Sequence, residues 1–212
     1  MYRPDVESSR LSIRMRGGSL GHHQAFQREE RFSEWQSEAM GELVHVLGAM
    51  AAERVFYEQN TSGVGGDLQS ATFRAAYMVG TSGMGPQPIV LEGGKFADES
   101  AEETRERIMQ RFEKVGLTLM NRTQGGGVLA SDPIASVLQD RFKRAYAAQI
   151  LGQAYVTAEN FIATNRDAVE RIAAAVIAKG ELYGDDLVGL LDQQRLQKPE
   201  IDWLEEATWP RI

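Results

Sequence analysis

Apolar residues recur at helical spacing through most of this sequence, and this periodicity limits the fold more than any other feature. A helix is predicted at about residues 34–58, because Ser33 and Gln36 form a capping-box signature in front of an apolar stripe. A second helix is predicted after the turn TSGVGGDLQS and ends at the glycines of TSGMGPQP. The two stripes consist of Trp35, Ala39, Met40, Leu43, Leu47, Met50 and Ala51, and of Leu68, Ala71, Ala75, Met78 and Val79.

Further helices are predicted in the second half of the chain. Ser100 and Glu103 form another capping box, in front of a stripe made by Ile108, Phe112, Val115 and Leu119. Asp132-Pro133 is typical of a helix start, and this helix should run to about Ala163. A break at residues 164–167 leads into a helix over 168–179 that ends at Gly180, and a short helix opens at residues 184–186.

One strand is predicted near the N-terminus. Residues Leu11–Met15 alternate apolar and polar side chains and are followed by Gly17 and Gly18, as in a half-buried strand. The predicted fold class is therefore mainly α, with one short β-strand or hairpin near the N-terminus.

Composition excludes several classes of function. Hydrophobic residues at 42% and charged residues at 25% are ordinary for a globular chain. The net charge of −7 gives no basic surface for nucleic acid, so no nucleic-acid partner is expected. The absence of cysteine excludes disulfides and thiolate zinc sites. No signal peptide and no apolar run of roughly 18 residues is found, so we expect no membrane segment in this chain and a cytoplasmic location.

The turn TSGVGGDLQS contains one acidic residue, Asp67, at the start of a predicted helix. The turn is not a phosphate-binding P-loop, because no lysine followed by Ser or Thr comes after its glycines. Two interpretations remain open from these residues: Asp67 caps the helix, or it binds a metal ion.

The histidines offer no familiar metal motif. His45 falls in a helical stripe and is interpreted as a partly buried helix residue, whereas His22 and His23 are interpreted as a surface loop. Adjacent residues cannot share a helix face as the ligands of H-E-x-x-H do. Neither that motif nor the G-x-S-x-G of serine hydrolases occurs in the 212 residues.

Several segments together resemble the peptidase domain of the FtsH family of AAA proteases. They are Gly48-Ala-Met-Ala-Ala-Glu53, Thr61-Ser-Gly-Val-Gly-Gly-Asp67-Leu68, Ala71-Thr72, Met78-Val79 and Gly83-Met84-Gly85. The family pattern is close to G-G-x-A-A-E, T-T-G-A-x-x-D-L, A-T, M-V and G-M-S in the same order. The resemblance covers about residues 11–191 and is weakest across 86–132.

This resemblance implies a helical zinc endopeptidase. In the family, two histidines of H-E-x-x-H and a downstream aspartate bind zinc, and the glutamate of the motif acts on the attacking water. Asp67 stands at the position of the third ligand. The resemblance also implies unfolded or tagged protein substrates and a hexameric ring, hence a homo-oligomer. With an anchor encoded upstream, the location would be the cytoplasmic face of a membrane.

The sequence departs from the family at the catalytic motif. In the family, the H-E-x-x-H helix lies shortly before the strand matched by Leu11–Arg16, and the AAA module and membrane anchor lie further upstream. Because one carboxylate cannot hold catalytic zinc, we expect this chain alone to bind no zinc and to cleave no peptides. Two hypotheses stay open: an enzyme fragment whose catalytic helix lies upstream or was removed, and a non-catalytic oligomeric binding or assembly module.

Two further expectations concern substrate and domains. An exposed strand could receive an extended peptide by strand addition, and an ordinary internal strand is the alternative. The residues of this candidate substrate-binding strand are Leu11, Ser12, Ile13, Arg14, Met15 and Arg16. We predict a peptidase-like domain at 1–194, with a C-terminal helical part at about 133–194, and a tail at 195–212.

Overall fold

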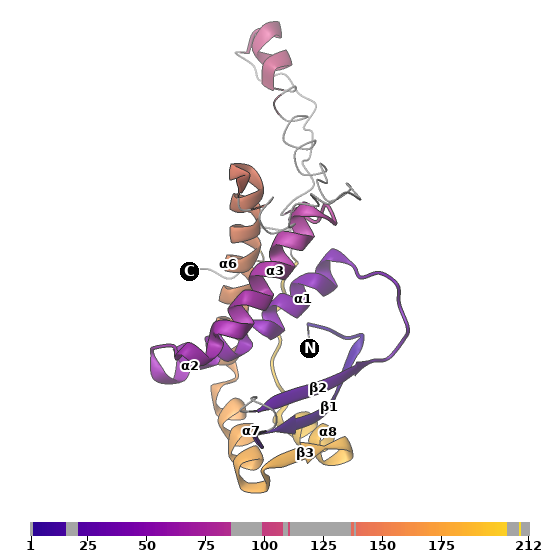
Figure 1. The fold of residues 1–212 in the computed structure, drawn as a ribbon, viewed down its shortest axis with the longest axis vertical. Coiled ribbons are helices and arrows are strands. Elements are labelled where there is room, and N and C mark those ends of the chain that lie inside the picture. The colour runs from indigo at the N-terminus through magenta and orange to yellow at the C-terminus, as the bar shows by residue number, and fades with distance from the viewer. Residues whose placement is uncertain are drawn as a thin grey trace, which may run out of the picture. The chain divides into compact units, whose positions relative to one another are not determined.

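The computed structural model describes residues 2–15, 21–85, 99–107, 110, 137, 139–202 and 208. These residues are mainly helical with one small antiparallel sheet, so the predicted fold class is confirmed (Figure 1). The chain divides into two units, one of residues 1–61, 155–200 and 212, the other of residues 62–154 and 201–211. Where the predicted domain and tail begin and end stays a prediction.

The sheet of the first unit has the strand order β2-β1-β3. Strand β1 is Val6–Ser12, and it pairs antiparallel with β2, His22–Gln27, and with β3, Glu181–Tyr183. The predicted strand therefore exists but lies five residues earlier at its start, and residues 13–15 follow it. Leu11 is paired with His23 on one side and with Leu182 on the other.

Helices α7 and α8 cover the sheet and close a small core. Helix α7 is Arg166–Lys179 and α8 is Gly184–Gln194. Buried Val176, Leu182 and Leu187 form the centre of this core, and Leu11 packs against them. Both helices were predicted, and Gly180 ends α7 at a φ of 75°, a left-handed conformation that favours glycine.

The predicted helix at 34–58 is bent into two. Helix α1 is Gln36–Val46 and α2 is Gly48–Tyr57. Backbone hydrogen bonds continue through the bend, since the Leu47 N–H donates to the Leu43 carbonyl and the Leu47 carbonyl accepts from Ala51. The helix starts two residues later than the Ser33 box predicts, because the Glu38 carboxylate accepts the Trp35 N–H at 2.8 Å.

The second unit contains the short 3-10 helix η1, Ser62–Val64, and helix α3, Gly65–Gly80. The α3 stripe is buried at Ala71, Ala75 and Val79, while Leu68 is 39% exposed. Helix α6, Arg141–Thr164, contributes residues to both units and ends within one residue of the prediction.

The predicted helix after Ser100 is confirmed at residues 101–107. Its capping box is present, because Ser100 N–H donates to the Glu103 carboxylate at 2.8 Å and Glu103 N–H donates to Ser100 Oγ at 3.2 Å. Residues 108, 112, 115 and 119 of its stripe, and the predicted helix start at 132–133, lie outside the described residues.

Candidate functional site

Asp67 lies in the first turn of α3 and is partly buried. Two glycines, Gly65 and Gly66, begin the helix, and an added Cβ at either would meet nothing within 4 Å. The helix cap is Val64, and no side chain makes the cap hydrogen bond. The capping interpretation of Asp67 is therefore wrong in its detail: its carboxylate complements the helix dipole from inside the first turn.

A link between two of the sequence motifs was missed by sequence reasoning. Glu53, at the end of the Gly48–Glu53 motif, accepts the Thr61 N–H at 2.7 Å and the Thr61 hydroxyl at 2.8 Å. These hydrogen bonds to the charged form hold the pKa of the Glu53 carboxyl below its usual range. Helix α2 thereby fixes the residue with which the turn TSGVGGDLQS begins. The signal available in the sequence was that both residues belong to motifs of one pattern.

Asn60, the residue before Thr61, is also hydrogen-bonded to helix α2. The side-chain amide of Asn60 donates to the Met50 carbonyl at 2.8 Å. Glu58 caps the C-terminus of α2 with a left-handed φ of 58°, and the chain returns along the helix from there. Asn60 and Thr61 are thus both held by side-chain hydrogen bonds to α2 residues.

The candidate substrate-binding residues occupy the end of β1 and the segment after it. Leu11 and Ser12 pair with both neighbouring strands, and the Ile13 N–H donates to the Gly180 carbonyl at 3.1 Å. Ile13 and Met15 are 47% and 75% exposed. Arg14 N–H donates to Ser12 Oγ at 3.2 Å, and Arg16 lies outside the described residues. Strand addition at these residues stays a prediction.

The histidine interpretations need correction. His22 and His23 lie in strand β2, because their backbone pairs with Ser12 and Leu11, and not in a loop. His45 lies in α1 as predicted, but its side chain is 54% exposed rather than partly buried. The rings of His23 and His45 pack edge to face with centroids 5.0 Å apart. Partial burial, together with the neighbouring His45, lowers the pKa of His23.

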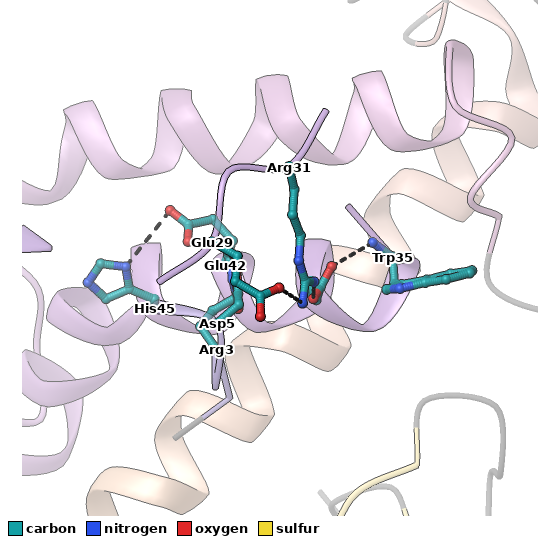
Figure 2. Close-up of polar contacts among 8 residues, drawn as sticks. Arg3, Asp5, Glu29, Arg31, Trp35, Glu42 and His45 are labelled. Carbon is teal, nitrogen blue, oxygen red and sulfur yellow. Dashed lines mark hydrogen bonds and ion pairs between the residues drawn. The ribbon is translucent and has the colours of Figure 1, made fainter. Parts of the chain in front are cut away.

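Charged residues line α1 and tie the N-terminal segment to it (Figure 2). Arg3 bridges Asp5 and Glu42, each at 2.8 Å, and the other Glu42 oxygen lies 3.9 Å from His45 Nδ1. Farther toward the start of the helix, Arg31 pairs with Glu38 at 2.6 Å. The hydrogen bond to Arg3 holds the pKa of Asp5 below its usual range. The network is structural, because each charge in it faces an opposite one.

A shallow pocket of about 400 Å³ lies on the sheet and is lined by Ser9, Arg10, Gln24, Glu181 and Tyr183. Arg10 Nε donates to the Glu181 carboxylate at 2.6 Å, and this bond lowers the pKa of Glu181. Neither Asp67 nor any histidine lines the pocket.

Among the described residues, no three His, Asp or Glu side chains are arranged to hold a metal ion. Asp67 is therefore placed without partners of that kind in this part of the chain. No helix in the same described ranges has the length and apolar character to cross a bilayer.

Comparison with known proteins identifies the fold family. The model of peptidase family M41 matches residues 3–115, which is more than half of the chain. An ATP-dependent zinc metalloprotease FtsH of Rubrobacter xylanophilus is 27% identical over 184 residues, which are 87% of this chain and 25% of the relative. FtsH 4 of a Synechocystis species is 28% identical over 188 residues, 87% of this chain and 26% of the relative.

A third relative extends the match along the chain. FtsH of Acaryochloris marina is 25% identical over 203 residues, which are 95% of this chain and 27% of the relative. The chain thus spans about a quarter of the length of the curated relatives it matches. The matched region includes β1, the α2 motif with Glu53 and the turn with Asp67. The chain belongs to peptidase family M41.

Proposed function

We propose that this chain supplies the downstream part of a zinc endopeptidase site, with Asp67 as one metal ligand. The observation that carries this proposal is the place of Asp67, partly buried in the first turn of α3. A ligand needs such a fixed backbone, because metal sites tolerate little positional freedom.

The residues present do not fit a catalytic zinc ion by themselves. Such a site needs three protein ligands and an open position. The described residues contain no group of three candidate ligands, and the 212 residues contain no H-E-x-x-H. No hydrolytic step follows from these residues alone, so we expect the isolated chain to lack peptidase activity.

The wider function is proposed from the relatives, which are named ATP-dependent zinc metalloproteases. The complete protein would degrade unfolded or tagged proteins, with ATP hydrolysis supplied by another module, as a homo-oligomeric ring at the cytoplasmic face of a membrane. Extended substrates would pair with the segment Ile13–Met15, which follows β1 and in which Ile13 and Met15 are exposed.

The test restores the missing motif. An H-E-x-x-H segment, taken from in-frame coding sequence before Met1 or from the Rubrobacter relative, is joined to the chain, and hydrolysis of unfolded casein and zinc content are measured. We expect zinc-dependent hydrolysis by the extended chain and none by the 212 residues. Asp67→Asn should reduce the rate at least about a hundredfold, because it removes a ligand charge.

Asp167→Asn is the matched control, since Asp167 also lies in the first turn of a helix, α7. It should leave hydrolysis unchanged. Chelator-sensitive hydrolysis by the 212 residues, or full activity of the extended Asp67→Asn variant, would contradict the proposal. An inactive, metal-free but oligomeric extended chain would instead support a non-catalytic assembly module.

A further inference from the structure

Strand β2 has little buried surface to hold it in place. Every residue of the strand after His22 is exposed, and Phe26, its largest apolar side chain, is 52% exposed. Among the described strands it pairs with β1 alone, so it lies at the edge of the sheet. Segments with few buried contacts open most easily. A side-chain contact between β2 and a helix should therefore change measurably how often this strand opens.

One such contact joins β2 to helix α1. The rings of His23 and His45 meet edge to face, with centroids 5.0 Å apart and an angle of 78° between the ring planes. Aromatic rings favour this arrangement, because the positive edge of one ring meets the negative face of the other. Imidazole is also the side chain that gains a positive charge between about pH 5 and pH 8. Two rings that are both protonated at this distance repel each other.

The groups that face His23 disfavour its charged form. From β1, the uncharged hydroxyl of Ser8 lies 2.9 Å from His23 Nε2. Desolvation of the covered part of the ring lowers the pKa of His23, His45 lowers it further, and Glu42 raises it. The Glu42 carboxylate is bound to Arg3 at 2.8 Å, which offsets part of its charge (Figure 2). The stabilisation is therefore present above the ordinary imidazole pKa of about 6.5, and it is lost as pH falls through the lowered value.

We propose that the contact of His23 with His45 makes the opening of strand β2 depend on pH: neutral rings hold the strand beside α1, and protonation of both rings releases it. The change should stay local to β2. The opposite side of the sheet is held by the pairing of β1 with β3 and by the core of Val176, Leu182 and Leu187, which do not titrate. This pH dependence needs no metal ion, and it is independent of Asp67 and of the proposed peptidase function.

The experiment measures amide hydrogen exchange of the 212-residue chain by NMR at pH 7.5 and at pH 5.0, with each rate corrected for the intrinsic rate at that pH. Relative to α7, protection of the β2 amides should fall at least about threefold at pH 5.0, as expected for two unit charges about 5 Å apart near water. His45→Gln removes one of the two charges and should abolish this fall. Because His45 is 54% exposed, the variant should fold, which circular dichroism checks.

Ring titrations by NMR give a second measurement that does not depend on opening of the strand. The pKa of His23 should rise in His45→Gln and fall in Glu42→Gln, because these changes remove neighbours of opposite charge. His22→Gln is the matched control, since neighbouring residues of a strand point to opposite faces, and it should behave as the parent does. The proposal is wrong if β2 protection is equal at both pH values, if the fall persists in His45→Gln, or if His22→Gln abolishes it.

Discussion

At the scale of single residues, the side chain of Asn165 makes hydrogen bonds to two separate backbone segments of the first unit. The residue is 5% exposed, and its amide donates to the carbonyls of Phe161 and Gln197, each at 2.8 Å. Its oxygen accepts the Gln197 N–H at 2.7 Å. One side chain thus ends α6 and also pairs with the backbone of the segment after α8.

We expect Asn165→Ala to lower the free energy of unfolding by about 1–3 kcal/mol, because it leaves buried backbone groups without partners. Urea unfolding measures this change, and faster hydrogen exchange at the Gln197 amide would locate it. Asn160→Ala is the matched control on the same helix, since among the described residues Asn160 donates to Val156, one turn earlier, and to no segment outside the helix. Equal losses in both variants would show that the contact with Gln197 contributes nothing.

Gly41 is the second residue whose identity the fold determines. A Cβ added to it would lie 2.4 Å from the Tyr2 carbonyl oxygen, so α1 and the N-terminal segment approach closely there. Gly41→Ala should therefore destabilise by about 1–3 kcal/mol through overpacking, despite alanine's better helix propensity. Gly189→Ala in α8 meets nothing within 4 Å and should stabilise by up to about 1 kcal/mol. Thermal unfolding measures the change in melting temperature of both variants. A change of the same sign in both would contradict this account.

At the scale of elements, the capping box at Ser100 gives a pH-dependent prediction. The bond from the Ser100 N–H lowers the pKa of Glu103 in the folded state. A carboxyl with a lowered pKa stabilises the fold above its ordinary pKa, and this contribution is lost as pH falls through the lowered value. We expect the helical carbon shifts of residues 101–107 to decrease at low pH in the parent and already at pH 7 in Glu103→Ala.

Glu102→Ala is the control for this element. Glu102 is exposed and lies beside Glu103, but the two capping-box hydrogen bonds join Ser100 to Glu103. The carbon shifts of this variant should follow those of the parent from pH 7 to pH 3. An identical response of the two glutamate variants would mean that the box does not determine where the helix starts.

Elements with strong periodicity could be predicted, and elements defined by long-range pairing could not. Helices α3, α7 and α8 follow from apolar stripes and from glycines at or near their ends. Strand β2 has the sequence HHQAFQ, which shows no apolar alternation, and β3 is only three residues long. Both exist because β1 pairs with them across the chain. The bend at Leu47 lies inside one continuous stripe, so no break in the pattern marks it.

Some residues of the candidate site could likewise be predicted from the sequence, and others could not. Asp67 could be singled out because it belongs to a motif that is continuous in sequence. The Glu53–Thr61 link joins two motifs through side chains, and the contact of His23 with His45 joins a strand to a helix. Spacing along the chain contains no information on either contact.

At the scale of the whole molecule, the first unit is built from two distant stretches of chain, residues 1–61 and 155–200. Tyr2 is one of the residues that join them. Its ring packs edge to face on Phe161 with centroids 5.9 Å apart, its hydroxyl donates to the Pro199 carbonyl at 3.5 Å, and Lys198 Nζ lies 5.0 Å from the ring centroid.

Burial raises the pKa of the Tyr2 phenol to about 12, because the folded state disfavours the phenolate. For such a group the stabilisation is fully present below the unfolded pKa of about 10 and is lost as pH rises toward 12. We therefore expect the melting temperature to fall between pH 10 and pH 12, and to fall less in Tyr2→Phe, which keeps the ring contacts and cannot ionise. Absorbance at 295 nm should show one phenol fewer titrating near pH 12 in this variant.

Tyr57→Phe provides the comparison, since Tyr57 belongs to the same unit but is 72% exposed and has little packing to lose. Its melting temperature should fall with pH as steeply as that of the parent. If Tyr2→Phe shows that same steep fall, ionisation of the Tyr2 phenol does not cause the loss of stability above pH 10. The pairing of β1 with β3 and the hydrogen bond from Arg166 to the Val55 carbonyl also join the two stretches and would then be the next contacts to test.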